Sequence, residues 1–468
     1  MNLRKTMGLA ALGLSLMYAG TAFAESYLVI AKGNKISSKQ LASIEKAGGV
    51  IRHVMSPVGM ALVDSDTADF QDIVGNINGI HSVPRDISQR FVSPVDGEAI
   101  SFQAASIEAV NPPITGDDDF FFDLQWGHTA INATDAWEKG HRGAGVRVAV
   151  LDSGIDVNHP DLAPNLNLFL SQTFVNEPLD SAIAAPGDTF NHGTHTAGTI
   201  GAADNGFGTI GVAPEVELVA VKVLYHSGSG PFGSIFAGMV YAAEIGADVV
   251  NMSLGASIPR NCTFYDEALD EFVHYPAWEC SALWTAGNRV ANYMRKMGTL
   301  VIASAGNDGR DLNKDASLKE FPNDLPGVVP VSATAPIGWL PYWPNSNLDY
   351  LASYSNYGTS SVQFSAPGGD YVYPGEELCG LVVVRPCWLF DFVFSTGTGG
   401  WYWSVGTSMA APHATGVAAL IIGANGGSGS MSPAQVIAAM KAGADDLGKP
   451  GKDSAYGHGR VNAANSVP

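Results

Sequence analysis

The stretch VRVAVLDSGID, residues 146–156, decides the fold. It opens with an apolar run that ends directly before Asp152, and such a run is typical of a strand with both faces covered. Similar runs recur along the chain and alternate with segments of helical spacing, such as residues 233–245. This alternation predicts an α/β domain with a parallel sheet and helices on both faces. Further strands are expected at residues 216–223, 249–254, 299–303 and 328–332.

Three separated blocks each offer one member of an acid, base and nucleophile set. Asp152 follows the first strand, at the carboxyl end where parallel sheets bind ligands. His192 opens the block HGTHTAG, and Ser408 lies within GTSMA, residues 406–410. A serine hydroxyl becomes an effective nucleophile when an imidazole takes its proton, and the imidazole needs a carboxylate to fix its tautomer. The chain order Asp, His, Ser is one of three orders known for this arrangement.

The three blocks resemble the motifs of the subtilisin-like serine proteases, the subtilases. The resemblance runs from about Trp126 to the C-terminus, with two interruptions. It implies a secreted endopeptidase that cleaves polypeptides through an acyl-enzyme at Ser408, with His192 as general base and Asp152 orienting it. A lone serine here is more often a helix cap, but the GTSMA run favours the catalytic role. His195 is expected to be structural, because the glutamate of a zinc-protease motif is absent.

The resemblance also assigns residues that bind substrate. Asn307 follows the expected strand at 299–303 and matches the side-chain donor of the subtilase oxyanion hole, where donors are aimed at developing charge. Two edge segments are expected to sandwich an extended substrate strand. Asp308 is expected near the first pocket, where a basic and a large hydrophobic side chain are both open possibilities. The edge segments are Ser229, Gly230 and Pro231, and Ser253, Leu254 and Gly255.

A structural calcium ion is a further implication of the resemblance. The loop ADNGFGT, residues 203–209, has the length and position of a subtilase calcium loop. Oxygen-rich, flexible coordination suits calcium. Asp123 is a candidate for the ligand that comes from the start of the catalytic domain. The other expected ligands are the carboxylate of Asp161, the side chain of Asn205 and the carbonyl groups of Ala203, Phe207 and Thr209.

Residues 1–24 have the pattern of a secretory signal. Basic Arg4 and Lys5 precede an apolar run over residues 7–17, and AFA at 22–24 is a cleavage pattern. The run is too short for a membrane span. We therefore expect an exported monomer, extracellular or periplasmic, with no membrane contact after signal removal. The formal net charge of −20 also argues against nucleic acid or anionic lipid as a partner.

The region between the signal and the protease divides into two parts. Residues 25–90 have the spacing of a β-α-β-β-α-β unit, a small α+β ferredoxin-like domain. Its position resembles that of the subtilase propeptide, which implies a folding chaperone that blocks the active site until it is removed. Residues 91–120 are interpreted as a linker with little to bury, containing the processing site. The catalytic domain is expected over residues 121–468.

The four cysteines of an exported chain predict disulfides. The pairs Cys262 with Cys280 and Cys379 with Cys387 are favoured among three possible pairings, because each closes a local loop. Each pair lies in an insertion that interrupts the family resemblance. These insertions either shape substrate choice or decorate the surface. They occupy about 257–298 and part of 337–403.

Two other functions are compatible with parts of the sequence. A catalytically silent binding module could keep the subtilase scaffold, but the four catalytic positions are intact. An esterase of the α/β-hydrolase type is disfavoured because Ser408 lacks the Gly-x-Ser-x-Gly elbow of that class.

Overall fold

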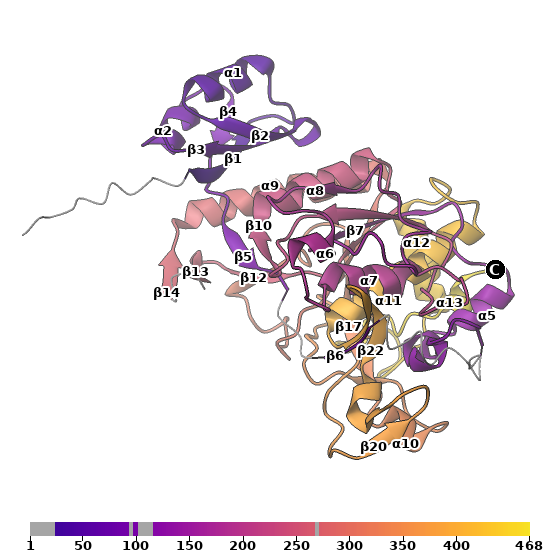
Figure 1. Ribbon diagram of the computed structural model, residues 1–468. Helices are drawn as coiled ribbons and strands as arrows, with labels where there is room; N and C mark the ends of the chain where they lie inside the picture. Colours follow the sequence, from indigo (N-terminus) through magenta and orange to yellow (C-terminus); the bar gives the residue numbers. More distant parts are fainter. Residues whose placement is uncertain (1–23, 93–96, 102–115, 267–270) are drawn as a thin grey trace, which may run out of the picture.

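The computed structural model describes residues 24–92, 97–101, 116–266 and 271–468. Figure 1 shows a small N-terminal domain resting on a larger domain. The expected signal sequence lies outside the described residues except for Ala24.

The N-terminal domain has the element order that its sequence predicts. Its elements are β1 (Glu25–Ala31), α1 (Ser38–Lys46), β2 (Val50–Met55), β3 (Met60–Ser65), α2 (Phe70–Gly75) and β4 (Ile80–Ser82). The strands form an antiparallel sheet in the order β2-β3-β1-β4. Ser37 starts α1 with a capping box, in which its side chain and that of Gln40 each accept the other residue's backbone N–H.

The larger domain is built around an eight-stranded, mostly parallel sheet. Its strands are β7 (Arg147–Asp152), β8 (Gln172–Thr173), β9 (Glu217–Lys222), β11 (Val249–Met252), β15 (Leu300–Ser304), β17 (Val328–Ala335), β18 (Tyr350–Leu351) and β19 (Phe364–Pro367). They follow the order β18-β17-β15-β11-β7-β9-β8, with β19 also paired to β17. The pair β17–β18 is antiparallel, and the other pairs are parallel. The five strands expected from the sequence are confirmed as β7, β9, β11, β15 and β17.

Successive residues of β7 enter two different hydrophobic cores, because side chains of a strand alternate between its faces. Val148 and Val150 join the core beneath α7 (His192–Gly201) and α11 (Thr407–Ala424). Ala149 and Leu151 join the core beneath α8 (Phe232–Glu244) and α9 (Ala277–Met297). Helices therefore cover both faces of the sheet, as expected (Figure 1). Helix α9 lies in the first cysteine-bearing insertion and was not expected from the sequence.

Helix α11 runs through the centre of the larger domain. Among the described residues it is the one helix long and apolar enough to cross a membrane, and 83% of it is buried inside the structure. Such burial is the environment of a core helix. The remaining helical elements are η1 (Ser56–Val58), η2 (Phe122–Leu124), α4 (Trp126–Ala130), α5 (Ala133–Glu138), α6 (Ser181–Ala184), α10 (Trp339–Tyr342), η3 (Cys387–Asp391), α12 (Pro433–Gly443) and α13 (Ala463–Ser466).

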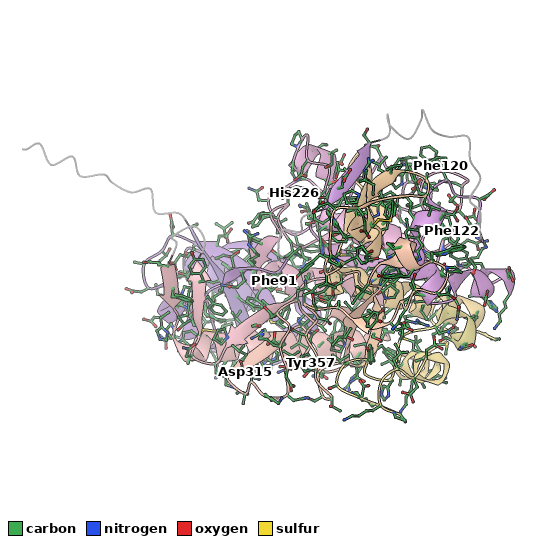
Figure 2. The ribbon with its side chains drawn as sticks, turned by 90° about the horizontal axis from the view of Figure 1, so that it is seen from below. Phe91, Phe120, Phe122, His226, Asp315 and Tyr357 are labelled. Carbon is green, nitrogen blue, oxygen red and sulfur yellow. A yellow bond between two sulfur atoms is a disulfide. The ribbon has the colours of Figure 1, made fainter. Side chains whose placement is uncertain are left out.

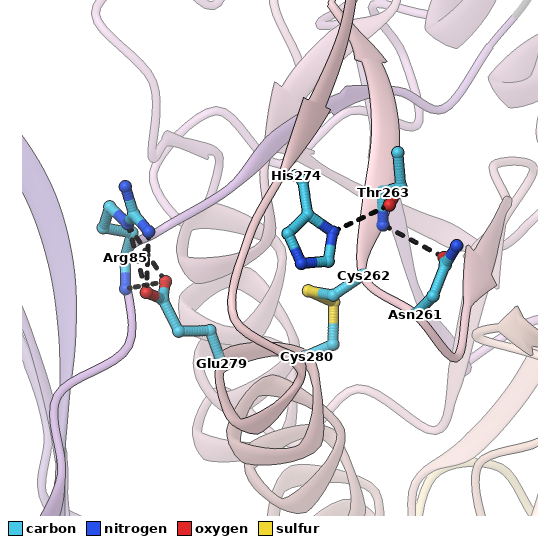
Figure 3. Close-up of a disulfide and its surroundings, with 7 residues drawn as sticks. All are labelled: Arg85, Asn261, Cys262, Thr263, His274, Glu279 and Cys280. Carbon is cyan, nitrogen blue, oxygen red and sulfur yellow. Dashed lines mark hydrogen bonds and ion pairs between the residues drawn. A yellow bond between two sulfur atoms is a disulfide. The ribbon is translucent and has the colours of Figure 1, made fainter.

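Both expected disulfides are present, Cys262–Cys280 and Cys379–Cys387. The first ties the start of a hairpin to the first turn of α9 (Figure 3). The second ties one strand of another hairpin to η3. The hairpins are formed by β13 (Thr263–Asp266) with β14 (Glu271–His274), and by β20 (Leu378–Gly380) with β21 (Val384–Pro386).

The expectation that residues 91–120 have little to bury is wrong for the parts that the structure describes. Phe91 and Val92 are buried in one of the two main cores, and Ile100 is buried in the other. Strand β6 (Glu98–Ser101) adds a third strand to the hairpin of β22 (Val393–Gly397) and β23 (Gly400–Ser404), and Ile100 lies opposite Trp401. The sequence did not predict this burial, because the proline, glycine and aspartate residues of this region are typical of a linker. Residues 102–115 lie outside the described residues, and the processing site stays a prediction.

The N-terminal sheet is buried on both faces. Tyr27 and Val29 face α1 and α2 in a core of their own. Leu28 and Ile30, on the opposite face, belong to the same core as α8 and α9. The N-terminal domain is therefore docked on these two helices by a continuous apolar contact.

An ion pair adds to this junction (Figure 3). Arg85 Nη2 lies 2.9 Å from Glu279 Oε1 on α9, and the Arg85 backbone N–H donates to Oε2 at 3.1 Å. The Glu279 side chain is 1% exposed, so its charge has lost most of its contact with water. A buried charge needs a partner, and Arg85 is that partner.

We predict that Arg85→Met loosens the docked N-terminal domain. The change leaves the Glu279 carboxylate buried without its cation, which costs about 3 kcal/mol, or roughly a hundredfold in the opening equilibrium. Hydrogen exchange of β1–β4 amides in a full-length Ser408→Ala chain measures this opening. Arg52→Met is the matched control, because the Arg52–Asp64 pair is solvent-exposed and lies within the domain. Equal protection in both variants would contradict the assignment.

Candidate active site

Asp152 and His192 form a buried hydrogen-bonded pair at the carboxyl edge of the sheet. Asp152 ends β7, and His192 begins α7. His192 Nδ1 lies 2.9 Å from both carboxylate oxygens of Asp152, and the two side chains are 4% and 1% exposed. The Ser153 backbone N–H also donates to Asp152 Oδ1, at 2.6 Å. These contacts fix the imidazole with Nε2 as its free nitrogen.

Ser408 lies in the first turn of α11 and lines the same pocket as His192. Its hydroxyl donates to the Ser253 carbonyl at 3.1 Å, and the Ser253 hydroxyl donates to the Ser408 carbonyl at 2.7 Å. His192 Nε2 has no hydrogen-bond partner among the described residues. In this rotamer the nucleophilic oxygen faces Ser253, so proton transfer to His192 requires rotation about the Ser408 Cα–Cβ bond.

Asn307 is held beside Ser408 in a defined orientation. Its side-chain oxygen accepts from the Thr407 backbone N–H at 2.9 Å and from the Thr407 hydroxyl at 2.7 Å. Its Nδ2 lies on the side of Gly406, 3.4 Å from where a β-carbon on that glycine would stand. The amide therefore presents a donor next to the start of α11, and Asn307 lines the same pocket as Ser408.

The predicted substrate edges meet a segment of the chain itself. Strand β5 (Ser88–Arg90) pairs antiparallel with β10 (Ser229–Pro231), one of the two expected edges. On the other edge, the Gly255 N–H donates to the Phe91 carbonyl at 3.0 Å. Ser253 and Leu254 precede Gly255, directly after β11. Residues 88–91 thus lie between both edges as an added strand.

The ring of Phe91 anchors this segment. Phe91 is 4% exposed and packs against Phe232 and Phe321, with ring centroids 5.1 and 6.0 Å away. Its label in Figure 2 lies between the N-terminal domain and the body of the larger domain. The aromatic pocket formed by Phe232 and Phe321 was not identified from the sequence, because the two rings come from elements distant in the chain.

The pocket next to Ser408 has a volume of about 310 Å³. Asp308 lines it, as expected, and so does Glu320, which the sequence analysis did not single out. Glu320 lies on β16 (Leu318–Phe321), which pairs with β12 (Ala256–Pro259) so that Ser257 stands opposite Glu320. This cross-strand register, which has no motif of its own, carries Glu320 into the pocket.

The neighbouring histidine of α7 hydrogen-bonds to backbone carbonyl groups and packs against the ring of Phe190. His195 Nε2 lies 3.0 Å from the Tyr402 carbonyl and 3.2 Å from the Val393 carbonyl. Burial lowers the pKa of His195 to about 3, so the ring stays neutral and links α7 to the hairpin of β22 and β23.

The predicted calcium loop is contacted by Asp119, which the sequence analysis did not single out. Asp119 Oδ1 accepts from the Phe207 N–H at 3.1 Å and the Asn205 N–H at 3.4 Å. Asp123 belongs to the turn η2 and lines a separate pocket. The chain turns at Asp119–Phe122, and the Asp119 carboxylate reaches the loop from this turn.

Two buried carboxylates flank the loop and have unpaired oxygens. Asp161 Oδ2 accepts from the Thr209 N–H and from Trp401 Nε1, each at 2.8 Å. Asp161 Oδ1 and Asp119 Oδ2 are buried without a hydrogen-bond partner among the described residues. Burial raises the pKa of Asp161 to about 7 and, with the nearby Asp117, the pKa of Asp119 to about 8. These residues fit a divalent cation, because unpaired carboxylate oxygens are the ligands that calcium prefers. Asp117, Asp118, Asp119 and Asp204 also have carboxylate oxygens within 4.8 Å of one another.

Comparison with known proteins agrees with this arrangement. The model of the Subtilase family matches residues 143–459. Subtilisin Savinase of Lederbergia lenta is 35% identical over 342 residues, covering 73% of this chain and 97% of that protein. Thermitase of Thermoactinomyces vulgaris is 30% identical over 355 residues, covering 75% of this chain and 99% of that protein.

The crystal structure of the epidermin leader peptide processing serine protease from Staphylococcus aureus shares the fold. Its TM-score is 0.71 at 21% identity, over 95% of this chain and 98% of that one. Fold and relatives together define a serine endopeptidase. The chain belongs to the subtilase family.

Proposed function

We propose that Ser408 forms the acyl-enzyme, with His192 as general base and Asp152 orienting the imidazole. The observation that carries this proposal is the buried Asp152–His192 pair, which faces the pocket lined by Ser408 and Asn307. His192 takes the hydroxyl proton at Nε2 as the serine oxygen attacks the carbonyl carbon. It then gives that proton to the leaving amine, and a water molecule repeats the sequence to release the acyl group.

The oxyanion of each tetrahedral intermediate is stabilised by the Asn307 Nδ2–H and the Ser408 backbone N–H. Both donors are in place before the reaction, because Thr407 holds the Asn307 oxygen and α11 holds the Ser408 amide. Donors that need no reorganisation stabilise the transition state more than the ground state. The N-terminus of α11 adds a favourable dipole for negative charge.

We predict that Asn307→Leu lowers kcat by about 10²–10³ while KM changes little, because the lost donor acts mainly on the transition state. Steady-state hydrolysis of a peptide anilide measures both constants. A fluorophosphonate probe should still label Ser408 in this variant, whereas Ser408→Ala should abolish labelling and hydrolysis. Asn292→Ala, an exposed amide on α9, is the control for general destabilisation. Labelling that persists in Ser408→Ala would refute the assigned nucleophile.

The N-terminal domain is proposed to act as an intramolecular inhibitor. Residues 88–91 occupy both substrate edges by main-chain pairing, so a substrate strand cannot bind at the same time. The domain that precedes them is docked on α8 and α9 through the shared core and the Arg85–Glu279 pair. Removal of this domain therefore frees the edges, and the enzyme is made as a zymogen.

We predict that Phe91→Ala weakens the block. Truncation of a buried phenylalanine costs about 3–5 kcal/mol, which is more than a hundredfold in occupancy. The rate of fluorophosphonate labelling in freshly purified full-length protein should rise accordingly. Ile73→Ala removes a half-exposed apolar side chain of the same domain and should leave the rate unchanged. If both variants are labelled at the wild-type rate, Phe91 does not hold the segment in the active site.

Calcium is proposed as a structural ion at the 203–209 loop. Asp161 and Asp119 supply carboxylate oxygens, and the Asn205 side chain with the carbonyls of Ala203, Phe207 and Thr209 completes the set. The unpaired buried oxygens of the two aspartates support this proposal. A bound divalent cation would supply partners for these oxygens and hold the loop closed.

We predict that chelation lowers the melting temperature of a full-length Ser408→Ala chain by about 3 °C, the linkage expected when calcium is present at about a hundred times its dissociation constant. Asp119→Asn should remove most of this calcium-dependent shift. Asp446→Asn, an exposed carboxylate outside the loop, should retain it. If chelator leaves the melting temperature of the Ser408→Ala chain unchanged, the calcium proposal is wrong.

We further propose that the protein is exported and acts as a monomer. The signal pattern of residues 1–24 supports export, although it lies almost wholly outside the described residues. The two disulfides support it independently, because disulfides persist in oxidising compartments.

A further inference from the structure

The pocket beside Ser408 contains a carboxylate at its inner end. The Glu320 side chain is 13% exposed, and its Oε2 accepts from the Ser257 hydroxyl at 2.8 Å. Asp308 lines the same pocket and is 56% exposed, as at a rim. A substrate side chain that enters beside Ser408 therefore passes one carboxylate and approaches a second.

Arg310 neutralises only part of this charge. Its Nη2 lies 3.1 Å from Asp308 Oδ2 and 3.4 Å from Glu320 Oε1, and it donates to the Ser257 hydroxyl at 2.6 Å. Asp324 adds a third carboxylate, which accepts from the Glu320 backbone N–H at 3.0 Å. One guanidinium thus contacts two carboxylates, and Asp324 adds a further negative charge close to Glu320.

The negative charge of Glu320 is unfavourable at this largely buried position. Burial, together with the charges of Asp308 and Asp324, raises the pKa of Glu320 despite the opposing effects of Ser257 and Arg310. A large hydrophobic side chain would remove the remaining water without supplying a positive charge. A guanidinium or ammonium group would supply it.

Residues 88–92 already lie in the active site, so the basic residues that they bring to the pocket can be compared with those of the catalytic domain. Among the described residues that line this pocket, the one Lys or Arg is Arg90, and it belongs to the segment at residues 88–92 rather than to the catalytic domain. The catalytic domain itself contributes no Lys or Arg to the described lining. Asp308 and Glu320 therefore line the pocket without a Lys or Arg of the catalytic domain in the same described lining.

We propose that this pocket selects polypeptides with arginine or lysine at the residue that carries the scissile carbonyl, and that Glu320 determines this specificity. The proposal rests on the proposed catalytic role of Ser408. It resolves the two possibilities for the first pocket in favour of a basic side chain. Arg310 then serves to orient Glu320 through Ser257, and Asp308 stands at the entrance.

The test compares hydrolysis of three peptide anilides with the same leader and Arg, Lys or Phe before the anilide, using the processed enzyme. Wild type should show kcat/KM for Arg and Lys at least about tenfold above that for Phe. Glu320→Gln keeps the size of the side chain and an oxygen that can accept from Ser257. It should lower kcat/KM for Arg and Lys by about tenfold or more and leave that for Phe within about twofold.

Glu244→Gln is the matched control, because it makes the same chemical change at an exposed residue. Glu244 ends α8, whose first turn contacts the Phe91 segment, and a helix of 13 residues spans about 20 Å. It should keep the wild-type preference. A wild-type preference for Phe, or an unchanged Arg/Phe ratio in Glu320→Gln, would overturn the specificity proposal while labelling of Ser408 kept the catalytic one intact. Loss of both hydrolysis and labelling in processed wild type would overturn both.

Discussion

The hydrogen-bonded pair of Asp152 and His192 is the constraint on which the rest of the site depends. A carboxylate that is 1% exposed is stable as an anion only when its oxygens are occupied by donors. Asp152 obtains them from His192, from the Ser153 N–H and from the Ser153 hydroxyl. The end of β7 and the start of α7 are thereby locked together, and the imidazole is left with one free nitrogen toward the pocket.

This locking requires a close approach of backbone to backbone. A β-carbon on Gly193 would stand 2.1 Å from the Gly154 carbonyl and 3.0 Å from the Asp152 β-carbon. Any side chain at Gly193 would push α7 away from β7 and lengthen the Asp152–His192 contact. Behind the pair, Lys222 stands opposite Asp152 in β9, and its ammonium donates to the Ser153 carbonyl. The short loop after β7 is therefore held from both sides. Gly193 is required at its position because no side chain would fit there.

The sequence predicted what depends on local chemistry. The apolar runs predicted five central strands, the spacing of residues 25–90 predicted the element order of the N-terminal domain, and the local cysteine pairs predicted both disulfides. It did not predict what depends on tertiary register. Glu320 reaches the pocket because β16 pairs with β12, and Asp119 reaches the loop from the turn at Asp119–Phe122. Helix α9 was not expected, because it lies in an insertion that interrupts the family pattern. Such features are seen only in the folded structure, because neither the spacing nor the composition of a sequence shows which distant residues become neighbours.

The proposed self-inhibition and the proposed substrate preference draw on different contacts of one active site. The N-terminal segment gains its hold from backbone pairing, from the Phe91 ring and from the attached domain, whose docking on α8 and α9 raises its effective concentration at the edges. A substrate has no such attachment, so a larger share of its discrimination must come from the pocket beside Ser408. A desolvated charge is well suited to that task, because an incorrect side chain leaves it unpaired whereas a matching cation satisfies it. In these proposals the N-terminal domain blocks the active site through main-chain pairing and the Phe91 ring, whereas Glu320 selects the substrate through its charge.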